Sequence, residues 1–358
     1  MKKLKSINVF ITGAGAPGAP GIIKSLRYVT EREIWITGGD ASVATAVGAG
    51  LLDKIIQIPP ADSPDFAEEL LRICIREKAD VVLPLVTREL IPLSKQKQKF
   101  RACGITVSVS DTRALETANN KYLLMKFCRD NDIPVPEFQL VNTLEQFEQA
   151  AVRLGYPDRK ICFKPPVSNG QRGFRIINDS QDRMVSLLNE KPNNVFIGYD
   201  EFATICNSSS FFPELIVMEY LPGEEYSVDV LVDNGRFISA IPRSRDHIKM
   251  GISFVGTTVN DKEIIDYSRR IVEGLGLNGN IGLQFRRDGN GTPKIIESNP
   301  RLQGTIVLCT AAGENMVYKA VKLAMGEDPG KPGVRWGVRM IRYWDELFLD
   351  ENGNKIEI

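Results

Sequence analysis

Over the first third of the chain, short apolar runs alternate with amphipathic stretches. Ile7 to Thr12 is a β-branched run that enters a glycine-rich turn, Gly13 to Gly18, and then a predicted helix through Tyr28. The alternation continues with predicted strands at Ile34 to Thr37, Asp80 to Val86 and Ile105 to Ser110, and with a predicted helix at Phe66 to Glu77. Strands that alternate with helices in this way predict a parallel sheet.

The pattern changes near Asp111 to Asn119, where we expect the first domain boundary. Asn119 or Asn120 is a good N-cap for a helix over Lys121 to Arg129. Farther on, two predicted strands, Lys160 to Lys164 and Phe174 to Ile177, flank the glycine-bearing loop Val167 to Gly173, which indicates a hairpin with a mobile tip. The remaining predicted elements are a helix at Leu144 to Leu154, strands at Leu215 to Tyr220, Tyr226 to Val232, Phe237 to Ile241, Ile281 to Arg286 and Lys294 to Glu297, and helices at Lys262 to Gly274 and Asn315 to Met325.

A chain of 358 residues favours two or three domains over one. The later part is strand-rich and mixed, unlike the beginning, and Gly326 to Gly333 is typical of a linker to a short terminal segment. The predicted fold class is therefore α/β followed by α+β.

The overall charge gives no reason to expect nucleic acid or an anionic membrane as a partner. Lys plus Arg and Asp plus Glu both total 45, so any anion site must be local. The six cysteines are scattered without CxxC pairing, which favours reduced core residues over disulfides or a zinc site. No apolar run approaches the roughly 18 residues of a membrane-spanning helix, so a cytoplasmic location is expected.

The most informative polar cluster is Gln284 in one predicted strand with Glu297 and Asn299 in the next. Glu297 and Asn299 are two residues apart and so face one side of a strand. Mg²⁺ prefers oxygen donors and commonly bridges protein carboxylates to substrate phosphates, so this set, with Arg301 beside it, suits a nucleotide phosphate. A strand end with solvated polar residues is the alternative reading.

Two further segments suit a nucleotide. Lys164 ends an apolar strand before the loop that holds Ser168, Gly170 and Gly173, where backbone amides and the ammonium group would cover phosphate oxygens. An ordinary hairpin with an exposed lysine is the alternative. The second segment is an apolar strand through Glu219 to Leu221 that is followed by an acidic turn to Glu225. Its backbone would hydrogen-bond to adenine and a carboxylate would accept the ribose hydroxyls. A solvated edge strand with an acidic turn is the alternative.

The early glycine turn, Gly13 to Gly18, also resembles a dinucleotide fingerprint, with Asp40 as the only candidate acidic partner. Pro17 and Pro20 crowd this turn, and glycine turns also serve as packing devices, so an NAD(P)-binding oxidoreductase is the least favoured reading. His247, the only histidine, lies in a predicted basic loop and is expected to be solvated. Arg243 and Arg245 beside it are better candidates for holding an anionic substrate or an acyl phosphate.

Taken in order, Lys121, Lys164, Glu219, Glu225, Gln284 and the motif Glu297-Ser-Asn-Pro-Arg301 resemble the ATP-grasp superfamily, and most closely a single synthetase domain of the carbamoyl phosphate synthetase large subunit. The resemblance spans about Ile7 to Met325. It implies a Rossmann-like pre-ATP-grasp domain at 1–117, an ATP-grasp domain at 118–325 with a lid subdomain at 118–195 and a nucleotide and metal subdomain at 196–325, and a C-terminal segment at 326–358.

The resemblance also implies a role for each residue. Lys121 and Lys164 would bind phosphates, Glu219 the adenine and Glu225 the ribose. The implied metal ligands are Gln284, Glu297 and Asn299, with Mg²⁺ as the expected ion and Mn²⁺ left open. Arg301 would steady the phosphoryl group in transfer. The implied protein is an ATP-dependent carboxylate-amine ligase that makes an acyl phosphate from small-molecule substrates, with a homodimer left open.

Departures from the pattern narrow these expectations. The chain holds one synthetase half, and the loop Arg243 to Val255 has no recognisable bicarbonate signature, so carbamoyl phosphate synthesis itself is not expected. Gln284 stands where many relatives carry an acidic residue, which leaves the number of metals open. A regulatory protein that binds ATP without ligation is the main alternative function.

Overall fold

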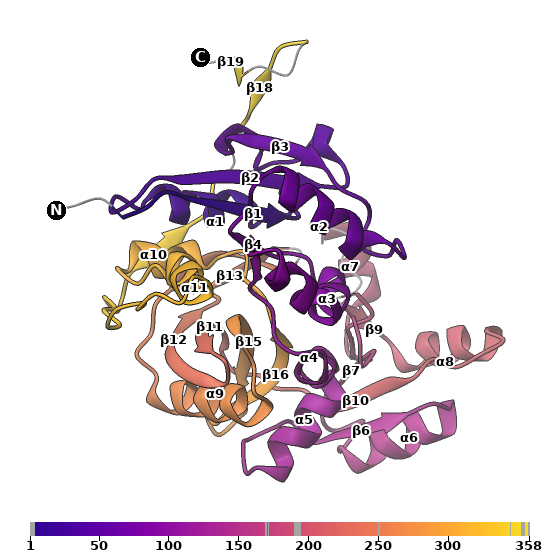
Figure 1. The fold of residues 1–358 in the computed structure, drawn as a ribbon. Helices are drawn as coiled ribbons and strands as arrows, with labels where there is room; N and C mark the ends of the chain where they lie inside the picture. The colour runs from indigo at the N-terminus through magenta and orange to yellow at the C-terminus, as the bar shows by residue number, and fades with distance from the viewer. Residues whose placement is uncertain are drawn as a thin grey trace. The chain divides into compact units, whose positions relative to one another are not determined.

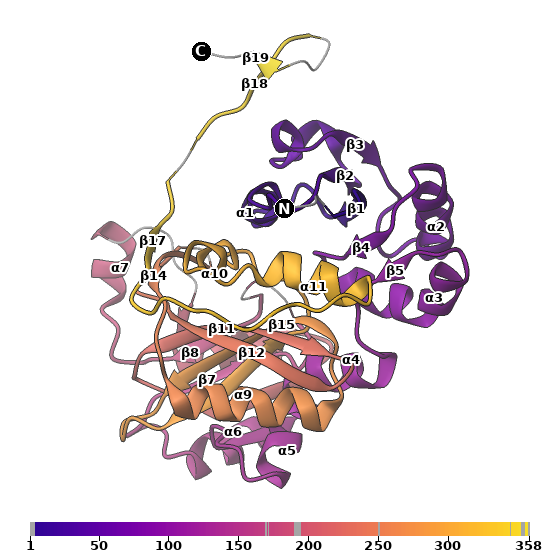
Figure 2. The same cartoon turned by 60° about the vertical axis from the view of Figure 1, so that its left-hand side comes forward.

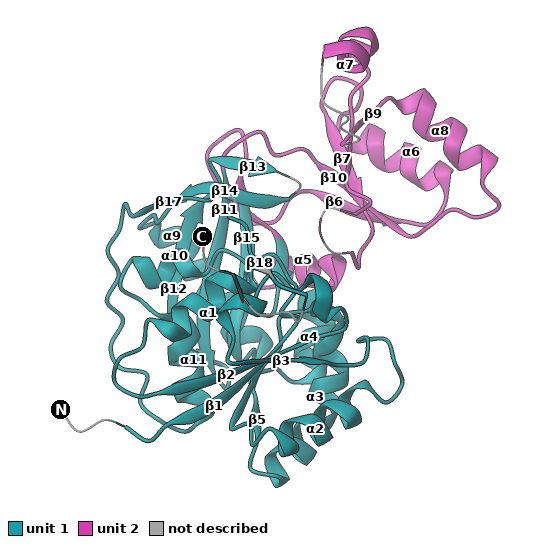
Figure 3. Cartoon of the chain, turned by 90° about the horizontal axis from the view of Figure 1, so that it is seen from above, with its two compact units in different colours: residues 1–119, 225–285, 297–358 teal, residues 120–224, 286–296 magenta. Residues whose placement is uncertain are grey.

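A computed structural model describes residues 4–168, 170, 172–189, 195–249, 251–343, 345–351 and 355–356. The chain forms two compact units, each made from separate stretches of sequence (Figure 3). Unit 1 comprises residues 1–119, 225–285 and 297–358, and unit 2 comprises residues 120–224 and 286–296. The division into functional domains at 117/118 and 325/326 stays a prediction.

The first sheet of unit 1 is parallel, in the order β3-β2-β1-β4-β5 (Figure 1). Its strands are β1 (Ile7–Thr12), β2 (Ile34–Asp40), β3 (Lys54–Gln57), β4 (Val81–Leu83) and β5 (Thr106–Val107). Ile7 pairs with Ile34, and Val9 with both Ile36 and Val81, so the predicted parallel sheet is confirmed. Strand β3 was not predicted because only two apolar residues lie between its polar ends.

Helices cover both faces of this sheet, which explains why β1 carries apolar side chains on both faces. Its Val9 and Ile11 belong to one core cluster with helix α1, while Phe10 belongs to another with α2 and α3. The helices are α1 (Ala19–Arg27), α2 (Phe66–Arg76), α3 (Leu90–Ala102) and α4 (Thr112–Asn119), and short 3₁₀ turns occupy Val43–Thr45, Ala49–Leu51 and Thr87–Glu89. Helices α3 and α4 were not predicted.

The second sheet of unit 1 has the order β12-β11-β15-β16, and some residues of β15 and β16 belong to unit 2. Its strands are β11 (Glu225–Asp233), β12 (Arg236–Ser244), β15 (Gly279–Arg287) and β16 (Pro293–Asn299). Helix α9 (Lys262–Leu275) packs on β11 and β12, while α11 (Met316–Ala324) contacts both β11 and α1 (Figure 2). Helix α10 (Val307–Ala311) also contacts α1, so one apolar core joins the two sheets.

The segment predicted as a linker, Gly326 to Gly333, ends in hydrogen bonds to unit 1. The amide of Gly333 donates to the Glu314 carboxylate, and the amide of Arg335 donates to the Ala312 carbonyl. A three-stranded sheet, β13-β14-β17, then ties the end of the chain to unit 1. Its strands are β13 (His247–Lys249), β14 (Ile252–Thr257) and β17 (Arg339–Ile341), and a small hairpin, β18 (Phe348–Leu349) with β19 (Lys355–Ile356), follows.

Unit 2 is built on a mixed sheet of order β6-β10-β7-β8-β9. Its elements are β6 (Phe138–Val141), β7 (Ile161–Lys164), β8 (Arg175–Ile177), β9 (Phe196–Ile197) and β10 (Leu215–Glu219), with helices α5 (Lys121–Asp130), α6 (Leu144–Arg153), α7 (Arg183–Asn189) and α8 (Tyr199–Ser208). Strands β7 and β8 are antiparallel neighbours, which confirms the predicted hairpin. Phe147, Phe163 and Phe202 pack against one another in the core of this unit, with ring centroids 4.4–5.4 Å apart.

Side-chain caps fix the starts of several helices. The Asn120 side chain accepts from the amides of Tyr122 and Leu123, which selects Asn120 over Asn119 as the N-cap of α5. Thr143 caps α6, and Gln146 bonds back to the amide of Asn142, as in a capping box. Among the helices of the described residues, none is long and apolar enough to cross a bilayer.

Candidate active site

The C-terminal end of β16 brings the predicted metal ligands of that strand together. The Asn299 Nδ2 donates to Glu297 Oε1 at 3.1 Å, so the prediction that the two side chains share a face is confirmed. Asn299 is buried and Glu297 is half-buried. Gln284 is half-buried on β15, the neighbouring strand of the sheet.

This donor set fits a divalent cation that is shared with a nucleotide. The described residues hold no cluster of three or more His, Cys, Asp or Glu side chains suited to a metal, so an all-protein cage is not formed there. One carboxylate and two amides supply oxygen atoms and a single negative charge, and the other ligands would have to be phosphate oxygens and water. Mg²⁺ is commonly bound in this way.

Arg301 is held in a defined orientation directly after this strand. Its Nε donates to Thr87 Oγ1 at 3.0 Å and its NH1 to the Leu302 carbonyl at 2.8 Å, while its NH2 lies 3.5 Å from Asn299 Oδ1. Burial lowers the pKa of Arg301, and the nearby carboxylates of Glu297 and Glu89 oppose that effect. A buried guanidinium with one preset orientation is suited to stabilising charge that develops on a phosphoryl group.

The carboxyl edge of the parallel sheet adds two acidic residues that sequence analysis did not place in the site. Glu89 is 4% exposed, and Thr12 at the end of β1 donates its hydroxyl to Glu89 Oε2. Burial raises the pKa of Glu89 to about 7. Asp40, at the end of β2, accepts from the amides of Gly15 and Ser42 at 2.6 and 2.8 Å.

These contacts argue against a dinucleotide in the glycine turn. Both oxygens of Asp40 already accept backbone amides, so this carboxylate is not free for ribose hydroxyls. A Cβ atom at Gly18 would lie 2.3 Å from the Cα of Gly304, so the turn packs directly on the chain segment that follows Arg301. The glycines of the turn allow this close packing of backbones.

Two expectations about the basic segment need correction. Arg243 lies within β12, not in a loop, and its side chain is buried in an ion pair of 2.8 Å with Asp229. Arg243 also donates to Thr305 Oγ1. Because the backbone of β12 pairs with β11 as far as Ser244, the arginine points into the interior, where its first role is structural. Its predicted contact with substrate stays a prediction.

Arg245 is also bound to partners within unit 1, and His247 is exposed as expected. Arg245 forms an ion pair with Glu225, the predicted ribose ligand, at 3.2 Å, and donates to the Gly251 carbonyl. His247 begins strand β13 instead of lying in a loop. Glu225 is half-buried, and its pairing with Arg245 fixes the carboxylate at the start of β11.

Unit 2 holds the two predicted phosphate-binding lysines, and both are buried. Lys121 Nζ donates to the Ser168 carbonyl at 2.7 Å, so it contacts the predicted phosphate loop. Lys164 Nζ donates to the Ile296 carbonyl at 2.8 Å, and Ile296 immediately precedes Glu297 along the chain. Neither lysine is an exposed hairpin flank.

The loop itself is described in part. Gly170 and Gly173 have positive φ angles of 64° and 76°, and a side chain at Gly173 would collide with Pro165. Asn169 and Gln171, which belong to the predicted loop, lie outside the described residues. The left-handed glycines let the backbone turn tightly after β7.

The predicted adenine segment is ordered by charge pairs within unit 2. Glu219 ends β10 and accepts from Lys294 and from the amide of Glu137, the latter at 3.2 Å. Leu221 is buried, and between them Tyr220 packs under the Arg286 guanidinium, 5.2 Å from the ring centroid. The Glu219 carboxylate therefore has a structural partner in Lys294, and its role toward a nucleotide stays a prediction.

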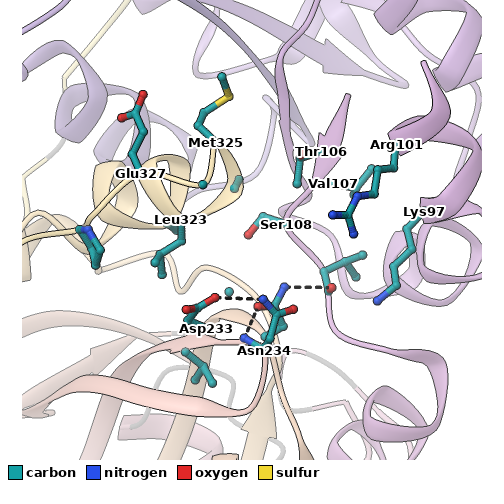
Figure 4. Close-up of a pocket in the computed structure, with 18 of the residues that line it drawn as sticks. Lys97, Arg101, Thr106, Val107, Ser108, Asp233, Asn234, Leu323, Met325 and Glu327 are labelled. Carbon is teal, nitrogen blue, oxygen red and sulfur yellow. Dashed lines mark hydrogen bonds between the residues drawn. The ribbon is translucent and has the colours of Figure 1, made fainter. Parts of the chain in front are cut away.

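A cavity of about 930 Å³ in unit 1 lies apart from these residues (Figure 4). Arg101 and Lys97 of α3, Ser108, the Asp233–Asn234 turn and Glu327 lie around it, and none of the predicted site residues lines it. Its acidic groups are paired internally, Asp233 with Arg236 and Glu327 with Arg32. The chemistry of the candidate site is elsewhere in the fold.

Comparison with known proteins agrees with this geometry. Residues 211–343 match the family described as "ATP-grasp in the biosynthetic pathway with Ter operon", and residues 21–108 match the "PylC-like, N-terminal domain" family. The solved structure of N5-carboxyaminoimidazole synthetase from Staphylococcus aureus, complexed with ADP, superposes with a TM-score of 0.66 at 16% identity, covering 92% of this chain and 80% of that one. Part of the chain therefore matches an ATP-grasp family, and the chain shares its fold with this synthetase. The predicted fold class, a Rossmann-like pre-ATP-grasp domain followed by an ATP-grasp module, is confirmed.

Two more known proteins are similar to this chain. The biotin carboxylase of Campylobacter jejuni, solved with a nucleotide, has a TM-score of 0.66 at 16% identity and covers 93% of this chain and 74% of its own. The arginine-specific large chain of carbamoyl phosphate synthase from Neurospora crassa is 24% identical over 321 residues, which cover 85% of this chain. This chain spans about a quarter of that relative's length, 25%.

Sequence analysis missed Thr87, Glu89 and Arg342. Thr87 contacts Arg301, and Glu89 lies within electrostatic reach of it. Arg342 donates to the Gly304 carbonyl from a segment that was expected to be a terminal extension. The polar run Thr87-Arg-Glu89 directly after an apolar strand was a usable signal, because ligands of parallel sheets bind at the carboxyl ends of strands.

Proposed function

We propose that this ATP-grasp protein is an ATP- and Mg²⁺-dependent ligase that activates a carboxylate as an acyl phosphate and transfers it to an amine or another nucleophile. The observation that supports this most directly is the set Glu297, Asn299 and Arg301. At one strand end the Asn299 amide lies 3.1 Å from the Glu297 carboxylate and 3.5 Å from the oriented Arg301 guanidinium. Phosphoryl transfer needs this combination of cation ligands and fixed positive charge.

Each part of the nucleotide has its proposed contacts. Lys121 and Lys164 would neutralise phosphate oxygens, with Ser168, Gly170 and Gly173 covering them. Glu219 and Leu221 would lie at the adenine, and Glu225 at the ribose. Buried ammonium groups are effective here because the surrounding low dielectric strengthens their attraction to phosphate.

Glu297, Asn299 and Gln284 would hold Mg²⁺. The ion would supply positive charge that offsets the charge of the nucleotide phosphates. Mn²⁺ has the same preference for oxygen ligands and would be accepted in its place.

The proposed reaction has two steps. A carboxylate oxygen of the acid attacks the γ-phosphorus, the bond to the β–γ bridging oxygen breaks, and ADP leaves. The nitrogen of an amine next attacks the acyl carbon, inorganic phosphate leaves, and the amine loses a proton to solvent. Arg301 would stabilise the phosphoryl group during the first step and the departing phosphate during the second.

The proposed substrates are a small carboxylic acid and an amine, and neither a nucleic acid nor a membrane takes part. A homodimer and a cytoplasmic location remain parts of this proposal. The main alternative, a nucleotide sensor, would use the same binding residues without releasing ADP.

A hydroxylamine screen tests the proposed function. Purified protein is incubated with ATP, Mg²⁺, hydroxylamine and one carboxylic acid at a time, and both ADP and the hydroxamate are measured. Hydroxylamine replaces the natural amine, so an acyl phosphate is detected without knowledge of that amine. We expect at least one acid to give ADP and hydroxamate in equal amounts, and Glu297→Gln to abolish both.

The outcomes separate the candidate functions. ATP binding without ADP release for any acid in a broad library would refute the ligase and favour the sensor. Tight binding of NADH, detected by its fluorescence, would favour the oxidoreductase. ADP release that does not depend on an acid would indicate an ATPase.

A further inference from the structure

Arg342 reaches the segment that follows the proposed metal ligands. Strand β17 pairs with β14 so that Ile341 lies opposite Val255, and the amide of Arg342 continues this pairing by donating to the Phe254 carbonyl at 2.8 Å. The half-buried side chain donates from NH2 to the Gly304 carbonyl, also at 2.8 Å. The end of the chain therefore contributes a cation to this region of unit 1.

Three arginines contact this one short segment. Arg301 donates to the Leu302 carbonyl, Arg342 to the Gly304 carbonyl, and Arg243 to the Thr305 hydroxyl. Three positive charges along five residues repel one another unless negative charges balance them.

The protein balances two of these charges. Asp229 pairs with Arg243 at 2.8 Å, and the carboxylate of Glu297 acts on Arg301. No carboxylate of the described residues forms an ion pair with Arg342. Burial lowers the pKa of Arg342, and the positive charge of Arg243 lowers it further.

A partly buried guanidinium beside a second one is costly unless an anion neutralises it. Resting on the proposed ligase function, we propose that Arg342 binds a second anionic group of the acid substrate, distinct from the carboxylate that is phosphorylated at Arg301. The substrate is then a small acid with two negative groups, such as a dicarboxylate or a phosphorylated carboxylic acid.

Both arginines contact the same short stretch of backbone. Arg301 donates to the Leu302 carbonyl and Arg342 to the Gly304 carbonyl, two residues farther on. This arrangement favours a small acid whose two anionic groups are close together. A long-chain monocarboxylate would leave Arg342 without an anion.

The acid identified by the hydroxylamine screen is compared with its analogue in which the second anionic group is a neutral amide. We expect the analogue to lose about 10- to 100-fold in kcat/KM, the range for one charged hydrogen-bonded contact. Arg342→Met should cause a similar loss for the dianionic acid and little loss for the analogue, while the KM for ATP stays near wild type. Arg342→Lys should restore part of the activity because it keeps the charge.

Arg339→Met is the matched control, since Arg339 is exposed on the same strand and should leave all values unchanged. Thermal unfolding of each variant separates loss of fold from loss of contact. If the identified acid carries a single anionic group, or if Arg342→Met weakens both compounds equally, the inference is wrong while the ligase function stands. If no acid yields ADP and hydroxamate, the ligase function itself is refuted.

Discussion

The buried ion pair of Arg243 and Asp229 allows a test of whether Arg243 mainly stabilises the fold. Both side chains are 2% exposed and their charged atoms lie 2.8 Å apart. Asp229→Asn removes the negative charge and leaves the guanidinium buried without compensation, which costs about 3–5 kcal/mol of folding free energy.

The opposite change should cost less. Burial raises the pKa of Asp229 and Arg243 opposes that rise, so in Arg243→Met the carboxyl group can take up a proton and become neutral. The guanidinium group cannot become neutral in the same way, because arginine does not deprotonate in proteins. The thiol of Cys309 also donates to Asp229 Oδ2 at 3.2 Å and would still satisfy one oxygen.

Urea unfolding followed by circular dichroism measures these costs. The single variants Asp229→Leu and Arg243→Met form a cycle with the double variant Asp229→Leu/Arg243→Met. We expect the double variant to be more stable than Asp229→Asn, because an apolar pair of similar volume replaces a buried ion pair at little cost. Strict additivity of the two single effects would refute the coupling. An unchanged stability in Asp229→Asn would mean that Arg243 has another partner and is available to a substrate.

Three further predictions follow from the site. Glu297→Gln should reduce acid-dependent ADP formation by about 10²-fold or more while ATP binding weakens modestly, because a neutral amide is a poor ligand for Mg²⁺; near wild-type turnover at limiting Mg²⁺ would refute this role. Burial raises the pKa of the Glu89 carboxyl group from 4.5 to about 7 in the folded protein. Between these two pH values the folded protein keeps this proton and the unfolded chain loses it, so the free energy of unfolding should fall by roughly 3 kcal/mol as the pH rises from 4.5 to 7. Glu89→Gln should flatten this slope in urea titrations at several pH values, and an unchanged slope would contradict the assignment. Hydrogen exchange across Phe163 to Ile177 should slow when ATP and Mg²⁺ bind, and equal exchange with and without nucleotide would remove the loop from the phosphate site.

Local pattern was sufficient for several elements of the site. The run Ile7 to Thr12 and its glycine turn predicted a strand, a turn and a helix, which are β1 and α1. The two-residue period of a strand predicted that Glu297 and Asn299 share a face, and their hydrogen bond agrees. Each of these inferences depends on residues close together in sequence.

The basic segment shows where local pattern was misleading. Arg243 and Arg245 were assigned to a loop because polar residues usually mark solvent-exposed chain. In the structure β12 continues to Ser244, and the acidic partner of Arg243 is Asp229 on the adjacent strand. A polar residue can be buried when a partner from another strand neutralises it, and the sequence of one strand does not contain that partner.

The sequence by itself determined the parallel sheet of the first hundred residues, the order of the candidate nucleotide and metal residues, and the shared face of Glu297 and Asn299. Only the tertiary structure decided that Gly18 packs on Gly304, that Thr87 orients Arg301, and that Arg342 reaches the same segment from the end of the chain. The physical reason is that periodicity and capping act over a few residues, whereas charge compensation and close packing depend on which distant segments meet. Residues separated by more than two hundred positions, such as Thr87 and Arg301, are brought into contact by the pairing of strands and the packing of one core.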